Sequence, residues 1–199
     1  DFIHLVKIAK MVGFKEIATD TNGRMFAYKD FAKKVFDAGL TDIYFSIHGH
    51  NAKIHDGLTG IPGAFEQLRQ GIENVRSLGF KNFGSHTTIV KQNFRFLPKI
   101  ADFIIRCGIR SAEFLYVIPA LGGAKKFFYE LVPKISEAAP YIKTCLDEGI
   151  KRNIKEWNIS HVPLCLFIGY EDQINQPDTI RTKTGLIKAE TTYFTDSRA

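Results

Sequence analysis

The sequence has little of what membrane, secreted and nucleic-acid-binding proteins need. Its longest apolar runs are short, as in FLYVIPAL, so no transmembrane helix is expected. The net charge is +6, but no run of five or more like charges occurs, which argues against a nucleic-acid partner. Cysteines are sparse and far apart: Cys107, Cys145 and Cys165. This odd number argues against a disulfide framework and predicts a cytoplasmic protein.

What the sequence does contain is a repeated unit, an amphipathic helix that ends at a glycine and is followed by a short β-rich run. Gly13, Gly39, Gly79 and Gly108 occupy the position where a helix C-cap favours a left-handed residue. The runs predict parallel strands near 15–19, 42–47, 84–90 and 112–118, and WNISHVPLCLFIGY predicts one more strand. Strand and helix in steady alternation predict the α/β class and a partial (β/α) TIM-type barrel.

The organisation changes along the chain. Residues 1–123 carry the repeated unit and are expected to form the partial barrel core. Residues 124–170 are expected to add its last helical and strand unit, in a helical segment interrupted by Pro133 and Pro140. Residues 171–199 are polar and turn-rich, and they predict a tail or the start of a C-terminal extension.

Ligands of parallel α/β folds bind at the carboxyl ends of the strands, so the loops at these ends are the candidate site. They read TDTNG at 19–23, SIHGH at 46–50, HTTIVKQN at 86–93 and VIPALGG at 117–123. Each loop also has a purely structural interpretation. Asp20 or Thr21 would then satisfy backbone amides of a turn, and the other polar residues would be ordinary strand residues.

The histidines of the second loop raise the possibility of a metal site. His48 and His50, with His86 from the next strand, are candidates for a metal-dependent barrel hydrolase. Gly49 is expected to break the strand between the first two histidines, and no acidic cluster completes a set of ligands. We therefore expect that His48, His50 and His55 do not jointly bind a metal, and that His55 and Asp56 cap a turn.

Taken together and in order, several segments resemble the radical S-adenosylmethionine (radical SAM) superfamily, and within it the molybdenum cofactor biosynthesis protein A-like proteins. They are IATDTNG, AGLTDIYFSIHG, HDGLTG, GAFEQLRQGIENV, TTIVKQN and AEFLYVIPALGG. The resemblance covers roughly residues 1–123. It implies an enzyme that cleaves SAM reductively to a 5′-deoxyadenosyl radical, which abstracts a hydrogen from a substrate.

One family feature is absent from the sequence. The C-x3-C-x2-C motif that binds a [4Fe–4S] cluster does not occur, and the spacing of the three cysteines does not replace it. A truncated chain and a degenerate homologue both explain this, and truncation is the explanation that we expect. The barrel is then incomplete at its N-terminus, this chain provides no metal ligands, and alone it is inactive.

The resemblance also implies roles for individual residues. Ser46, Thr87 and Ile118 match positions that contact SAM, and Asp20 and Asn22 lie where related enzymes contact substrate. The implied cofactors of the intact parent are SAM and a [4Fe–4S] cluster. The implied partners are a small-molecule or peptide substrate and an electron donor such as ferredoxin or flavodoxin.

The predicted fold makes this site testable by geometry. We expect Asp20, Ser46, Thr87 and Ile118 to line one concave surface at the carboxyl ends of the strands. Ile43, Phe45 and Ile47 should face the helices instead, because they alternate with the residues of the Ser46 face. A third interpretation, a βα scaffold that binds a partner without catalysis, remains open at this point.

Overall fold

The computed structural model describes residues 1–175. Residues 176–199, which include most of the predicted tail, lie outside the described part. The described α-helices are α1 (Phe2–Met11), α2 (Lys29–Ala38), α3 (Ala52–Thr59), α4 (Ala64–Ser77), α5 (Leu97–Arg106), α6 (Gly122–Lys126), α7 (Phe128–Leu131) and α8 (Ile135–Ile150). Short 3-10 helices are η1 (Met25–Ala27), η2 (Phe94–Phe96), η3 (Leu164–Leu166) and η4 (Glu171–Gln173).

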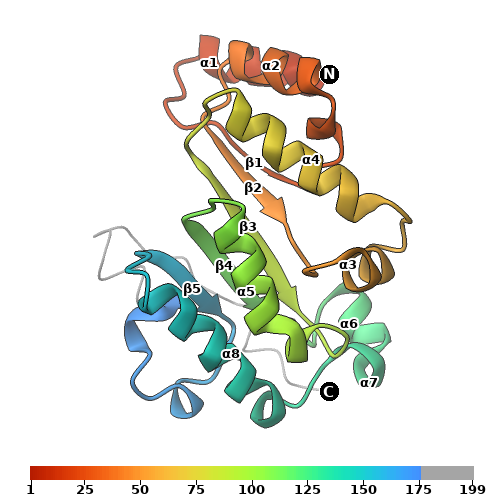
Figure 1. Ribbon diagram of the computed structural model, residues 1–199, viewed down its shortest axis with the longest axis vertical. Coiled ribbons are helices and arrows are strands. Elements are labelled where there is room, and N and C mark those ends of the chain that lie inside the picture. Colours follow the sequence, from red (N-terminus) through yellow and green to blue (C-terminus); the bar gives the residue numbers. More distant parts are fainter. Residues whose placement is uncertain (176–199) are drawn as a thin grey trace.

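The strands form one open, all-parallel sheet in sequence order. They are β1 (Ala18–Thr21), β2 (Asp42–Ser46), β3 (Phe83–Ile89), β4 (Ser111–Tyr116), β5 (Glu156–Ser160) and β6 (Ile174–Asn175). Each strand pairs in parallel with the next, and β1 and β6 form the two edges (Figure 1). This confirms the α/β class and the partial, unclosed barrel predicted from the repeated unit.

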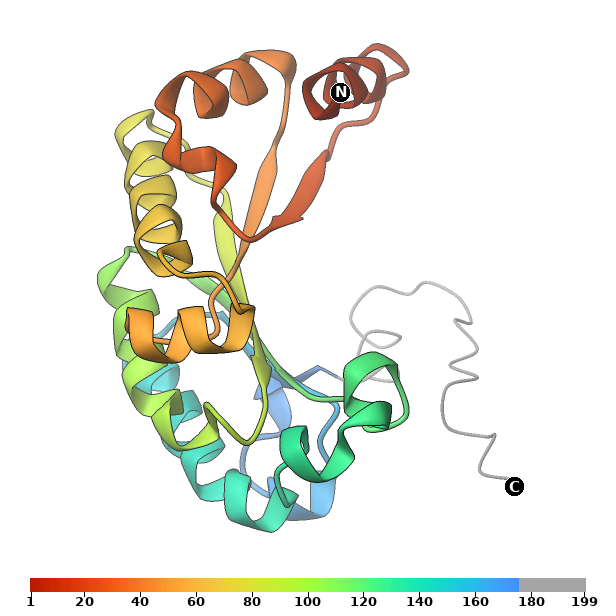
Figure 2. The same cartoon turned by 90° about the vertical axis from the view of Figure 1, so that its right-hand side faces the viewer.

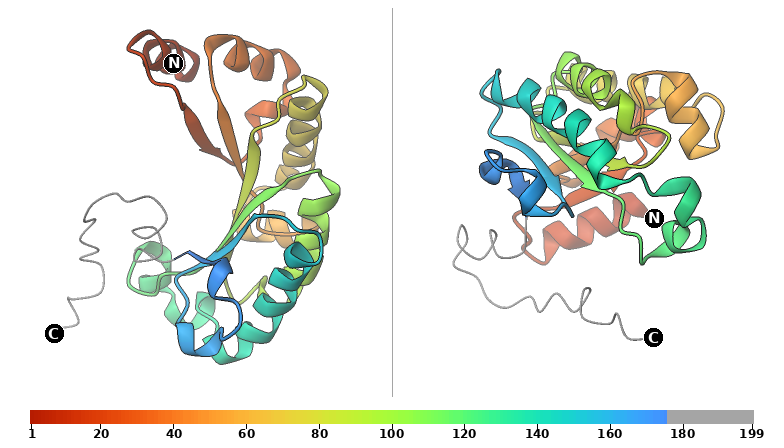
Figure 3. Two further views of the ribbon diagram at one scale, coloured as in Figure 1. Left: turned by 90° about the vertical axis from the view of Figure 1, so that its left-hand side faces the viewer. Right: turned by 90° about the horizontal axis from the view of Figure 1, so that it is seen from below.

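The sheet is curved, and helices cover its convex face. Helices α2, α4, α5 and α8 lie along this face (Figure 2). The concave face stays open between them, with α1 at one end and α6 and α7 at the other (Figure 3). Because a parallel sheet needs a crossover helix between successive strands, right-handed crossovers put those helices on the same side.

The hydrophobic core lies between the convex face and the helices. Ile43, Phe45 and Ile47 are fully buried there, as the alternation along β2 predicts. Phe45 packs edge-to-face against Phe26 of η1. Trp157 of β5 is also buried, and its indole N–H donates to the carbonyl of Cys145 in α8 at 3.0 Å.

The four predicted cap glycines all have positive φ, between 77° and 112°. Two strand predictions were displaced. The first strand begins at Ala18 rather than at residue 15, because the ladder with β2 starts at the pair Ala18 and Asp42. The predicted strand at 157–170 ends at Ser160, because His161 turns with a φ of 65° and Pro163 has no N–H to donate.

The segment after β4 differs from the prediction in one respect. Pro140 does not interrupt its helix, since α8 runs through it from Ile135 to Ile150. Within residues 1–175, no helix combines the length and the apolar character needed to span a membrane.

Candidate functional site

A row of polar side chains crosses the concave face of the sheet. In register, Ser46 of β2 lies beside His86 of β3, His86 beside Glu113 of β4, and Glu113 beside Asn158 of β5. Since side chains alternate between the two faces of a strand, these residues share the face opposite the core. The row is therefore built on four rigid strands rather than on loops.

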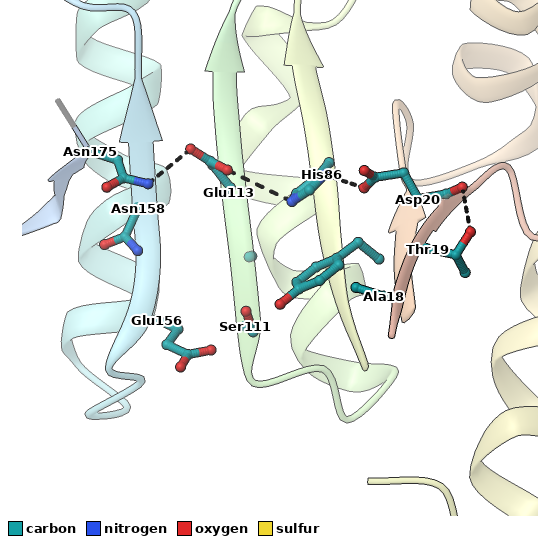
Figure 4. Close-up of a pocket in the computed structure, with 11 residues that line it drawn as sticks. Ala18, Thr19, Asp20, His86, Ser111, Glu113, Glu156, Asn158 and Asn175 are labelled. Atoms are coloured by element: carbon teal, nitrogen blue, oxygen red, sulfur yellow. Dashed lines mark hydrogen bonds and ion pairs between the residues drawn. The ribbon is translucent and has the colours of Figure 1, made fainter. Parts of the chain in front are cut away.

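His86, Glu113 and Asn158 of this row line a cavity of about 450 Å³, whereas Ser46 is not among its lining residues. Its lining residues are Ala18, Thr19, Asp20, Tyr44, His86, Ser111, Ala112, Glu113, Glu156, Asn158 and Asn175. Figure 4 shows that they come from both edges of the sheet as well as from its centre. A cavity of this size with a few convergent polar groups is suited to a small molecule.

His86 lies between two carboxylates of the cavity, those of Asp20 and Glu113 (Figure 4). Its Nδ1 lies 2.7 Å from Oδ1 of Asp20, and its Nε2 lies 3.7 Å from Oε2 of Glu113. Glu113 accepts hydrogen bonds from the Ser160 hydroxyl and, at 3.1 Å, from the Asn175 amide. These contacts fix the Glu113 carboxylate and orient the imidazole.

Tyr44 forms an aromatic wall of the cavity. Its ring stacks on the His86 imidazole with centroids 4.8 Å apart and planes 10° apart. Burial raises the pKa of its hydroxyl, and the carboxylates of Asp42, Glu156 and Asp20 raise it further. The hydroxyl is therefore neutral at physiological pH and available as a donor.

Two of the predicted site residues lie on this concave face. Ser46 is half-buried beside His86, and Asp20 lines the cavity with an exposed side chain. Ile118 is half-buried in the loop that follows β4. Asn22 is exposed and its side-chain oxygen accepts from the N–H of Arg24 at 3.1 Å, as in the turn considered from sequence.

The structure does not bring Thr87 to this surface, so the expected grouping was wrong for that residue. Thr87 is fully buried on the helix-covered face, and its hydroxyl donates to the carbonyl of Ile47 at 2.7 Å. The half-buried neighbour Thr88 takes the concave side instead. A shift of one residue along a strand reverses the face, and that is the origin of the error.

His48 and His50 lie in the loop after β2, whereas His55 and Asp56 lie in helix α3. His55 is buried, and its Nδ1 accepts from the backbone N–H of His48 at 3.3 Å. Asp56 accepts from the N–H groups of Gly63 and Phe65 at 2.8 and 2.7 Å, which caps the start of α4. Burial lowers the pKa of His48 to about 4.

The metal-hydrolase alternative is not favoured by this geometry. His86 contacts Asp20 and Glu113, whereas the ring of His48 stacks on that of His55 with centroids 6.0 Å apart. His48 and His86 thus have different partners. Among residues 1–175, no group of three or more His, Cys, Asp or Glu residues is arranged to hold a metal ion.

The cysteines do not fit an iron–sulfur cluster either. Cys107 is half-buried at the end of α5, Cys145 is buried in α8 and Cys165 is exposed in η3. Burial raises the pKa of Cys107 to about 11 and raises that of Cys145 well above its usual range, which disfavours the thiolate that a cluster needs.

The sequence prediction missed Tyr44, Glu113 and Asn158, and it considered His86 only as a metal ligand. Each of the three stands at an alternate position of a strand whose neighbours are apolar, as in DIYFS and SAEFLY. Polar residues at this spacing on several strands were the available signal, because they predict a second, polar face.

No family model matches the chain. An AdoMet-dependent heme synthase of Methanosarcina barkeri is 32% identical over 99 residues, which are 50% of this chain and 28% of that protein. A probable GTP 3′,8-cyclase of Saccharolobus islandicus is 24% identical over 156 residues, 78% of this chain and 48% of that protein. A probable GTP 3′,8-cyclase of Sulfurisphaera tokodaii is 25% identical over 129 residues, 65% and 40% of the two chains.

The matched stretch thus spans less than half of each of these relatives. A solved structure of the autolysin LytC from Streptococcus pneumoniae aligns with 78% of this chain and 35% of that chain. The identity is 12% and the TM-score is 0.45, which is only a weak structural likeness. The curated relatives and the parallel sheet agree with the motifs quoted above. They confirm the similarity of this chain to the radical SAM superfamily.

Proposed function

We propose that this chain forms the SAM- and substrate-facing part of a radical SAM enzyme. The observation that carries the proposal is its similarity to the heme synthase and the GTP cyclases, which extends over 50–78% of the chain. The chemistry proposed for the intact parent is reductive cleavage of SAM to a 5′-deoxyadenosyl radical, followed by abstraction of a substrate hydrogen.

Ser46 and Ile118 are the residues proposed to contact SAM. Ser46 is half-buried on the concave face, and a hydroxyl can both donate and accept hydrogen bonds, as the amino acid or ribose end of SAM requires. Ile118 follows the end of β4 and offers an apolar side chain to the adenine. Asp20 and Asn22 are proposed to contact the substrate, Asn22 through its side-chain NH2, since its Oδ1 accepts from the N–H of Arg24.

The cluster does not fit the cysteines of this chain. We propose that its ligands belong to a part of the intact protein other than residues 1–199. Residues 1–175 supply the walls that orient SAM and substrate and keep water away. The intact enzyme would also need a one-electron donor such as ferredoxin or flavodoxin.

The test uses the intact protein, purified without oxygen and reconstituted with iron and sulfide. Reduced with dithionite in the presence of SAM, it should release methionine and 5′-deoxyadenosine, measured by liquid chromatography and mass spectrometry. A protein with an intact cluster, verified by electron paramagnetic resonance, that forms no 5′-deoxyadenosine would contradict the proposal.

The role of Ser46 is tested in the same preparation by SAM binding. Ser46→Ala should raise the Kd for SAM about fivefold, which corresponds to the loss of roughly 1 kcal/mol for one neutral hydrogen bond. Ser77→Ala is the matched control, because Ser77 lies at the outer end of α4, where its hydroxyl bonds to the carbonyl of Asn74. Equal SAM affinity in wild type and Ser46→Ala would show that the serine has no such role.

A further inference from the structure

The cavity in the concave face has a charge opposite to that of the whole chain. Among residues 1–175, three carboxylates line it, those of Asp20, Glu113 and Glu156, and no lysine or arginine does. The chain as a whole has 27 lysines and arginines against 21 acidic residues. This described part of the lining is acidic, so the cavity favours a cation over an anion.

The three carboxylates differ in how many hydrogen-bond and ion-pair partners the protein gives them. Glu113 is held by Ser160 and Asn175. Asp20 uses one oxygen on His86, and its side chain is 70% exposed. Glu156 has no ion-pair or hydrogen-bond partner among the side chains of residues 1–175. Carboxylates only accept hydrogen bonds, so a molecule that satisfies Glu156 and Asp20 must bring donors.

Tyr44 supplies the second element of recognition, which is independent of the carboxylates. Its ring stacks on the imidazole of His86, and the residue is only half-buried on the cavity wall. Burial is the main cause of the raised pKa of its hydroxyl, and the negative charges of Asp42, Glu156 and Asp20 also raise it. A planar cation beside an aromatic ring gains attraction from the ring as well as from the carboxylates.

We propose that this cavity binds a small organic cation, such as an amine, amidine or guanidine, that lies against the ring of Tyr44 in the field of Glu156 and Asp20. A metal ion is a poorer occupant, because no three ligating side chains among residues 1–175 converge on one point. An organic cation does not need several ligands at one point, since its N–H groups point in several directions. The inference rests on the proposed function only in identifying this molecule with the substrate of the enzyme.

The cavity itself is tested with benzamidine, a planar aromatic cation, and with its neutral analogue benzamide. Titrations of the intact protein, followed by calorimetry, should show saturable binding of benzamidine and clearly weaker binding of benzamide. Glu156→Gln and Asp20→Asn should each weaken benzamidine binding roughly two- to fivefold, the range for one solvent-accessible ion pair. Both side chains are exposed, so neither substitution should prevent folding.

Glu137→Gln is the matched control. It removes the same charge from the first turn of α8, where Glu137 faces Lys134 at 3.7 Å, and it should leave benzamidine binding unchanged. Equal affinity for benzamidine and benzamide, no saturable binding of benzamidine, or wild-type affinity in Glu156→Gln would each overturn the inference.

A separate SAM titration distinguishes this inference from the proposed function. Glu156→Gln should bind SAM as the wild type does, because Glu156 lies at the start of β5 and Ser46 at the carboxyl end of β2. Normal SAM binding without selectivity for benzamidine would refute the cavity assignment alone. Selective benzamidine binding without SAM binding would refute the proposed function and leave the cavity assignment standing.

Discussion

Replacing Thr87 by valine separates a structural role of this residue from a role in SAM binding. Valine has nearly the same shape as threonine but lacks the hydroxyl that donates to the carbonyl of Ile47 at 2.7 Å. Thr87 is fully buried, so water cannot replace the lost donor. We expect the free energy of unfolding to fall by about 1–2 kcal/mol, the usual loss when a buried acceptor loses its partner.

Urea unfolding followed by circular dichroism should show a lower midpoint with an unchanged slope. In a domain of this size the melting temperature should fall by roughly 2–4 °C per kcal/mol. Thr88→Val is the matched control on the concave face, where Thr88 is half-buried, and it should change the stability by less than about 0.5 kcal/mol. Wild-type stability of Thr87→Val together with a loss of SAM affinity would refute this reasoning.

Three further predictions concern the core, acid stability and the ligand face. Gly149→Ala should destabilise the protein by about 1–3 kcal/mol in urea unfolding, since its Cβ would lie 2.3 Å from ring atoms of the buried Trp157; unchanged stability would show that α8 can shift. Burial lowers the pKa of His48 from 6.5 to about 4, so below pH 6.5 the histidine of the unfolded chain takes up a proton that the folded protein does not. The stability that depends on neutral His48 is therefore fully present above pH 6.5 and is lost as the pH falls towards 4. We expect a loss of roughly 2 kcal/mol between pH 7 and pH 5, and a smaller loss in His48→Gln, measured by urea midpoints at both pH values. Glu113→Gln should preserve the fold but loosen His86, which would appear as a changed environment of the His86 ring in NMR spectra; an unchanged ring would contradict the orienting role given to Glu113.

The fold followed from local chemistry that the sequence displays directly. Glycine C-caps, short β-rich runs and amphipathic helices recur in order, and parallel pairing follows from that order. Boundaries were less certain where tertiary contacts decide them. β1 starts where it meets Asp42 of β2, and β5 ends where His161 adopts a left-handed backbone conformation, which a non-glycine residue rarely does.

The candidate site was only partly visible in the sequence. The face of Ser46 followed from its alternation with the apolar residues Ile43, Phe45 and Ile47, whereas the run of two threonines at 87–88 left the face of Thr87 ambiguous. The contacts of His86 with Asp20 and Glu113 depend on the register across β1, β3 and β4 and on the curvature of the sheet. Neither quantity can be read from the spacing of residues along one strand.

The most direct test of the account is a crystal structure of the intact protein with SAM bound. The account predicts SAM on the concave face at the carboxyl ends of the strands, with a polar atom at about 3 Å from Oγ of Ser46 and the adenine against Ile118. It also predicts no contact between SAM and Thr87. SAM on the helix-covered side, or on the concave face without a contact to Ser46, would contradict it.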